Sequence, residues 1–168
     1  MRRAVLPVLA CLVFFPASAF ADHRSVRLSQ MELAYDGTRW RTEHSVLSDV
    51  TLQPIGDIAR ALDPVRIRVV AAERRADCEG HARHALASTL YGDAHDTALT
   101  IAGVDAVRLE AGARCRNAMP RAVAVCAAHN GRGYLFLVRQ TSCQDSGNNL
   151  FSGIDPLREV LEGVRFLP

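Results

Sequence analysis

The residue types that could do chemistry are gathered in one short segment, Asp77–His84, which reads Asp-Cys-Glu-Gly-His-Ala-Arg-His. On a helix, His81 and His84 stand on one side, and Cys78 lies about one turn earlier. Cysteine and histidine at such spacings can hold zinc or copper. The sequence therefore offers His81 and His84 as metal ligands. The competing interpretation is a solvated helix face, with Cys78 taken up by a disulfide.

Motifs for nucleophilic catalysis or nucleotide binding are not found in the sequence. No serine lies in a Gly-x-Ser-x-Gly context. The Gly-rich segment Asn130–Gly133 joins two expected strands, whereas a phosphate-binding loop would open a helix. We therefore assign no catalytic or cofactor-binding residue and favour a binding role over an enzymatic one. A small hydrolase with an unrecognised site stays an alternative.

Four cysteines, Cys78, Cys115, Cys126 and Cys143, follow the expected export signal. In an exported chain four cysteines most often form two disulfides, which allows three connectivities. The positions of the expected elements favour Cys115 with Cys126, and Cys78 with Cys143. The other two connectivities stay open.

The first 21 residues have the three parts of a cleavable secretory signal peptide. These are a positive start, an apolar run too short to span a membrane and a small-x-small cleavage site, at Arg2-Arg3, Ala4–Phe15 and Ala19-Phe20-Ala21. We therefore expect residues 22–168 to form the mature protein, periplasmic or secreted. No membrane span is expected after cleavage.

The charge of the chain does not point to nucleic acid. All 20 basic residues are arginines, two of them lie in the signal, and none of the 18 acidic residues does. The mature chain is thus balanced in charge and has no basic patch. The expected partner is an unidentified protein of the cell envelope.

Apolar residues alternate or recur at helical spacing in several segments. Leu33 and Trp40 are expected to face each other across a hairpin that turns at Asp36-Gly37. A second hairpin turns at Asn130-Gly131, and its two strands are apolar on both faces. The remaining expected elements are a strand at 65–72, an N-capped helix at 77–91, a strand at 99–109 interrupted at Ala102-Gly103, and a helix at 155–164.

This order of elements predicts an α+β fold in a single domain, residues 22–168. Because the strands on either side of Asn130-Gly131 have two apolar faces, they should be central and covered by helices on both sides. The expected architecture is an antiparallel sheet flanked by helices, an α/β/α sandwich.

The layout resembles the PsbP-like fold superfamily, which includes the extrinsic PsbP protein of photosystem II and a Ran-binding nuclear import factor. The resemblance spans nearly the whole mature chain. It depends on the hairpin near Trp40, the segment Leu99–Ala106, the strand Tyr134–Val138 and the helix running into Val164-Arg165-Phe166. It implies a non-catalytic binding or assembly role and does not name the partner.

Overall fold

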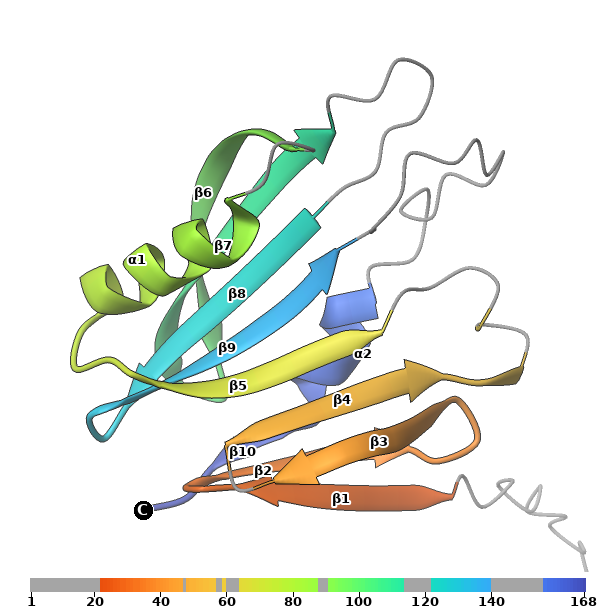
Figure 1. The fold of residues 1–168 in the computed structure, drawn as a ribbon. Helices are drawn as coiled ribbons and strands as arrows, with labels where there is room; N and C mark the ends of the chain where they lie inside the picture. Colours follow the sequence, from red (N-terminus) through yellow and green to blue (C-terminus); the bar gives the residue numbers. More distant parts are fainter. Residues whose placement is uncertain are drawn as a thin grey trace, which may run out of the picture.

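Ten strands and two helices are found in the part of the chain that the computed structural model describes, which is residues 22–46, 48–56, 59, 64–87, 91–113, 122–139 and 156–168. The strands form two antiparallel sheets, one of seven strands and one of three (Figure 1). The protein is therefore mostly β. The predicted α+β sandwich, with helices flanking both faces of one sheet, is wrong.

The larger sheet has the strand order β3-β4-β5-β9-β8-β7-β6, so β9 lies at its centre. Every neighbouring pair in it is antiparallel. Its strands are β3 (Trp40–Val46), β4 (Asp49–Pro54), β5 (Val65–Ala71), β6 (Tyr91–Ile101), β7 (Val104–Ala113), β8 (Ala122–His129) and β9 (Arg132–Arg139).

The turns at the ends of these strands confirm one sequence prediction and correct another. Asn130 and Gly131 join β8 to β9 with φ angles of 50° and 74°. Positive φ at both positions is what a two-residue type I′ turn requires. Ala102 and Gly103, with φ of 46° and 81°, join β6 to β7 in the same way. The interruption predicted there is thus a hairpin turn.

The two faces of the larger sheet bury separate apolar clusters. Helix α1 (Arg75–Leu86) packs over β7, β8 and β9 and covers an alanine-rich cluster. The three-stranded sheet and helix α2 (Pro156–Glu162) cover the larger cluster on the opposite face (Figure 1). The apolar pattern of β8 and β9 correctly predicts that both faces are covered. The prediction that helices cover both faces is wrong for the face opposite α1, which is covered mainly by the smaller sheet.

The smaller sheet contains β1 (His23–Leu28), β2 (Met31–Asp36) and β10 (Val164–Phe166), with β2 in the middle. Leu33 of β2 pairs with Val26 on one side and Val164 on the other. Trp40 instead pairs with Pro54 in the larger sheet. The predicted hairpin that placed Leu33 opposite Trp40 is therefore wrong.

Asp36 stabilises a local turn between β2 and β3. Its Oδ1 accepts hydrogen bonds from the hydroxyl and the backbone N–H of Thr38, at 2.7 and 2.8 Å. These bonds, the hydroxyl first, hold the pKa of the Asp36 carboxyl below its usual range. The side chain thus closes a local turn on its own backbone, at the point where the chain passes from β2 to β3 of the other sheet.

Helix α1 is shorter than predicted and is capped differently. The predicted N-cap, Asp77, lies inside the first turn, where its Oδ2 accepts hydrogen bonds from the N–H groups of Arg74 and Glu73, both at 3.0 Å. These two bonds lower the pKa of Asp77, with the bond from Arg74 the larger cause. The helix ends at Leu86, and Tyr91 already belongs to β6.

The last predicted helix is divided into α2 and the short strand β10. Leu157 and Val160 are buried as expected, whereas Val164 is a strand residue paired with Leu33. Gly163 lies between the two elements. Its N–H donates to the Val160 carbonyl at 3.2 Å, and its carbonyl accepts from Ala34 N at 2.9 Å. Gly163 therefore fixes the end of α2 against the backbone of β2.

Candidate functional site: a groove beside strand β6

Two of the three residues in the segment of the predicted metal site, Cys78 and His81, have other partners. Cys78 is bonded to Cys126. The Nε2 atom of His81 lies 2.8 Å from the carbonyl oxygen of Ala71 and must donate to it, because a carbonyl only accepts. His84 is exposed in the last turn of α1. Among the described residues no group of three or more metal-ligating side chains is found. A zinc or copper site at His81 and His84 stays a prediction.

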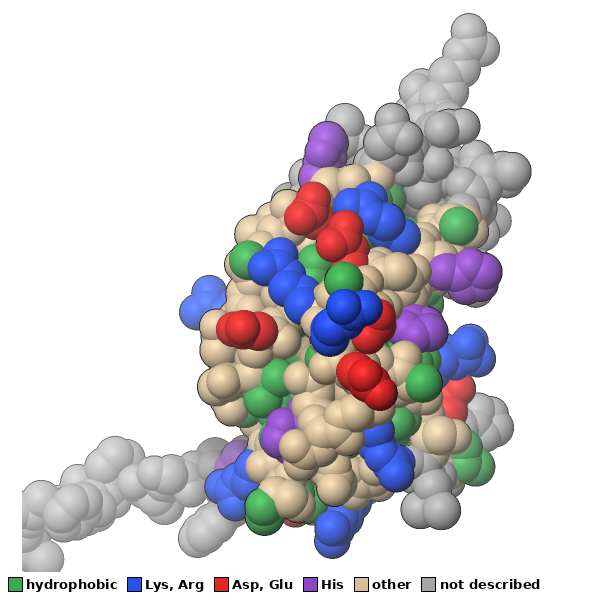
Figure 2. Space-filling view, turned by 90° about the vertical axis from the view of Figure 1, so that its left-hand side faces the viewer, with side chains coloured by type: hydrophobic (Ala, Val, Ile, Leu, Met, Phe, Trp, Pro, Cys, Tyr) green, Lys and Arg blue, Asp and Glu red, His purple; other side chains and the backbone are tan. Residues whose placement is uncertain are grey.

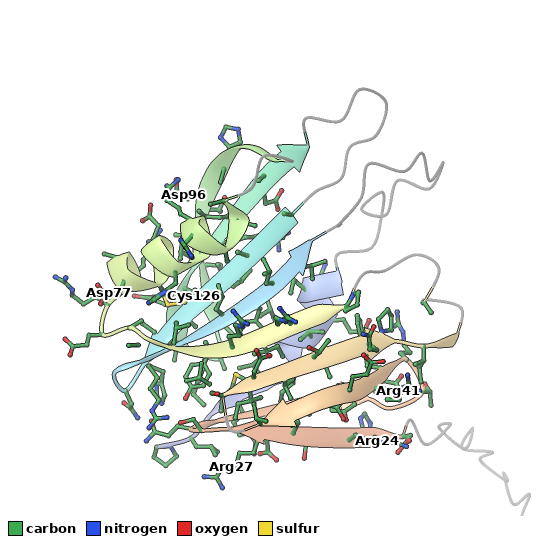
Figure 3. All side chains as sticks on the ribbon, in the orientation of Figure 1. Arg24, Arg27, Arg41, Asp77, Asp96 and Cys126 are labelled. Carbon is green, nitrogen blue, oxygen red and sulfur yellow. A yellow bond between two sulfur atoms is a disulfide. The ribbon has the colours of Figure 1, made fainter. Side chains whose placement is uncertain are left out.

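A disulfide joins Cys78 of α1 to Cys126 of β8, with the two Cα atoms 5.3 Å apart. Both cysteines are fully buried, and Figure 3 shows Cys126 beneath α1. The favoured pairing of Cys126 with Cys115, and of Cys78 with Cys143, is therefore wrong. Of the three connectivities, the one left pairs Cys115 with Cys143. Both lie outside the described residues, so that second disulfide stays a prediction.

An open groove of about 500 Å³ lies between α2 and the β6–β7 hairpin. Leu99 and Ile101 of β6 line it from the sheet, and Leu161 and Val164 line it from the C-terminal segment. These residues lie at the margin of the larger apolar cluster, where Leu99 and Leu161 are only partly buried. The groove thus forms because the layer that contains α2 does not extend as far as β6, the end of the larger sheet.

The charged side chains at the groove are paired with one another. Arg108 contacts Glu110 through both Nε and a terminal nitrogen, each at 2.7 Å. Arg158 contacts Glu162 one turn further along α2 at 3.1 Å. No histidine, cysteine or serine is among the described residues of the lining. The groove therefore suits binding of an apolar segment, and its described lining holds no nucleophile with a base beside it.

Strand β6 forms one end of the larger sheet, and no described strand pairs with its outer side. It has 11 residues and a register irregularity between Tyr91 and Ala94 only. From Ala94 to Ile101 the pairing of β6 with β7 is regular, and the only ionisable residues in that stretch are His95 and Asp96. An edge of this kind presents a row of unpaired backbone N–H and C=O groups.

The other outer strands carry features that discourage pairing. At the opposite end of the larger sheet, β3 has a register irregularity between Thr42 and His44 and an exposed Arg41–Glu43 ion pair. In the smaller sheet, β1 carries Arg24 and Arg27, and β10 has three residues. Bulges, charges and short length are the usual means by which proteins protect sheet edges. Among the described outer strands, β6 is the longest, and its stretch from Thr97 to Ile101 has neither a bulge nor a charged residue.

The charged side chains on the face that carries α1 have a mixed pattern (Figure 2). On the side that carries α1, acidic and basic side chains alternate, without an extended patch of one sign (Figure 2). Several of them pair on α1 itself, as Arg83 does with Glu79 at 2.7 Å. None of the described helices has the length and apolar character needed to cross a bilayer.

The groove was not predicted from the sequence. The segment Leu99–Ala106 was recognised as a strand element with apolar alternation, which was a usable signal for β6 and β7. What the alternation could not reveal is that the face with Leu99 and Ile101 is left partly uncovered. That exposure depends on α2, which lies more than 50 positions further along the chain.

Comparisons with known proteins assign no family to the chain. No protein-family model matches it, and no curated protein matches it significantly. A solved structure from Bacteroides thetaiotaomicron is similar, with 9% sequence identity and a TM-score of 0.47. The match covers 83% of this chain and 46% of the other, so this chain spans less than half of that protein. The similarity is too low to assign a fold family or a function.

Proposed function

We propose that the mature chain is an exported, periplasmic binding protein without catalytic activity, which acts by contacting another protein of the cell envelope. The observation that carries this proposal is the long, sparsely charged free edge of β6 beside an apolar groove. The resemblance to the PsbP-like superfamily implies the same class of role and stays a prediction.

An extended segment of the partner would add to the sheet as a further strand. Its backbone would pair with the outer N–H and C=O groups of β6, which supplies affinity without requiring a particular sequence. Every second side chain of the added strand would point to the face on which Leu99 and Ile101 lie. Because the groove opens on that face and is mainly apolar, the partner should carry apolar residues at alternate positions.

Export is supported by the buried Cys78–Cys126 disulfide, since such bonds persist in oxidising compartments. We expect the protein, tagged at its C-terminus, to fractionate with the soluble contents of the envelope and to begin at Asp22. N-terminal sequencing of the purified protein measures this directly. Recovery of an uncleaved chain from the membrane pellet would contradict the export proposal.

The contact is tested by placing cations on the edge strand. Ala98 and Thr100 are exposed on β6, so replacing both with lysine should preserve the fold while opposing the approach of another strand. Cross-linking and capture with the tagged wild-type protein, from its own envelope fraction, should recover a specific polypeptide. We expect Ala98→Lys/Thr100→Lys to reduce its recovery at least tenfold.

The matched control is Val46→Lys on β3, the opposite edge of the same sheet, where Val46 is 61% exposed. This variant should recover the polypeptide at the wild-type level. Equal recovery by all three proteins would place the contact away from β6 and refute the proposal. Loss of recovery in both variants would do the same, as would capture of nothing beyond the untagged control. Thermal unfolding of each variant confirms that it is folded.

A further inference from the structure

A second groove, of about 220 Å³, lies on the opposite face of the larger sheet from the β6 groove. It runs between the end of α1 and strand β5. Figure 1 shows that α1 lies over β7 and β8 and leaves the side of the sheet toward β5 without a helix above it. Leu135 and Leu137 of β9 form the floor of this groove. Leu135 belongs to the cluster beneath α1, which places the groove on the α1 face.

Two arginines of β5 lie on that face. In the sheet register Arg66 lies opposite Leu137, and Arg68 lies opposite Leu135, so both point to the side of the floor residues. His84 of α1 lines the groove from the other side. No carboxylate is among the described residues of its lining. The groove therefore combines an apolar floor with two arginines on its β5 side and a histidine on its α1 side.

The two arginines differ in how their charge is used. Arg68 donates through Nε to Asp49 Oδ2 at 2.9 Å, which engages one edge of its guanidinium. Arg66 is exposed and has no hydrogen bond or ion pair with any residue of the described structure. In a mature chain with equal numbers of acidic and basic residues, an arginine left unpaired beside a groove is available to a ligand.

A guanidinium presents a planar fork of donors that matches the oxygens of carboxylates and phosphates. The leucine floor would contact whatever carries that anion. We propose that this groove binds a small organic anion, in which a carboxylate or a phosphate is attached to an apolar body. Arg66 is the main ligand of the anion, Arg68 and His84 flank it, and Leu135 and Leu137 contact the apolar body. This site is separate from β6 and does not depend on the proposed protein contact.

The competing role for these side chains is structural. The C-terminal end of a helix carries partial negative charge, and arginines near the last turn of α1 would be favoured there without any ligand. A binding measurement distinguishes the two roles. An arginine that only neutralises the helix end would leave no affinity for an added anion.

Calorimetric titration of the oxidised mature protein with benzoate and with phenyl phosphate tests the proposal. The two probes share one apolar body and distinguish a carboxylate site from a phosphate site. We expect at least one of them to bind, and Arg66→Gln to weaken that binding at least tenfold, as loss of a charge-assisted hydrogen bond does. Benzyl alcohol, which lacks the anion, and acetate and inorganic phosphate, which lack the apolar body, should bind at least tenfold more weakly.

The matched control is Arg41→Gln, because Arg41 is an exposed arginine of the same sheet, paired with Glu43, and does not line the groove. Its affinity for the probe should equal that of the wild type. Absence of binding by both probes would overturn the proposal. So would equal binding by the wild type and Arg66→Gln, or binding of benzyl alcohol as tight as that of benzoate. Circular dichroism shows whether Arg66→Gln, a change at an exposed position, keeps the fold.

Discussion

Replacing Gly163 with alanine should lower the free energy of unfolding by about 3 kcal/mol, the upper part of the range for overpacking. A Cβ built on Gly163 would overlap the backbone carbonyl of Ala34. Neither backbone can move aside freely, because Ala34 N donates to the Gly163 carbonyl at 2.9 Å and Ala34 lies within β2. The variant must therefore separate β2 from the junction of α2 and β10. Urea unfolding followed by tryptophan fluorescence measures the change at Trp40, whose indole N–H donates to Glu159 of α2.

Gly80→Ala provides the matched control, since it is the same substitution at a site with open space. A Cβ on Gly80 would meet nothing within 4 Å, and the residue lies inside α1. Because glycine in a helix is less favourable than alanine, this variant should be more stable than the wild type by about 0.5–1 kcal/mol. If Gly163→Ala proves as stable as Gly80→Ala, the close approach of Gly163 to the backbone of Ala34 is refuted.

The turns show how far local sequence determines local structure in this protein. At Ala102-Gly103 the sequence predicts only an interruption of one strand. The turn at Asn130-Gly131 is predicted because asparagine and glycine tolerate positive φ and lie between apolar strands. Asp36-Gly37 has the same appearance, but there the aspartate bonds to Thr38 and the chain changes sheets. The dipeptide indicates a change of direction in each case. Which strand then pairs with which is decided by contacts far apart in the sequence.

The fold class was missed for a related reason. Apolar residues on both faces of β8 and β9 require two covering layers, and the sequence supplied two helical patterns that could serve. One of them, α1, does cover a face. The other helix is seven residues long, and most of its layer consists of β1, β2 and β10. A burial pattern records that a face is covered but does not record what covers it.

Neither candidate site could be predicted from the sequence. The β6 groove depends on where α2 stops, and the anion groove depends on where α1 stops relative to β5. In the segment of the predicted metal site, Cys78 and His81 have structural contacts, and His84 lies at the margin of a groove. The predicted disulfide at Cys78 is confirmed, but its partner is Cys126 and not the favoured Cys143.

Removing the Cys78–Cys126 disulfide should lower the free energy of unfolding by about 4 kcal/mol, the loop-closure value for cysteines 48 residues apart. The bond restrains the unfolded chain, and it also joins α1 to β8 over a cluster that is rich in alanine. Alanines bury little apolar area, so packing alone holds α1 weakly. We therefore expect Cys78→Ala/Cys126→Ala to remain folded with a lower unfolding midpoint, and amide hydrogen exchange to be faster in α1 than in β9.

Thiol titration of denatured, unreduced variants separates this disulfide from the predicted second one. In Cys115→Ser/Cys143→Ser, only Cys78 and Cys126 remain after signal removal, so zero reactive thiols would demonstrate their bond directly. Two thiols there would refute it and would return Cys78 to His81 and His84 as a possible metal ligand. In Cys78→Ala/Cys126→Ala, zero thiols would establish the bond between Cys115 and Cys143. Two thiols would mean that the mature protein carries a single disulfide, the one that holds α1 to the sheet.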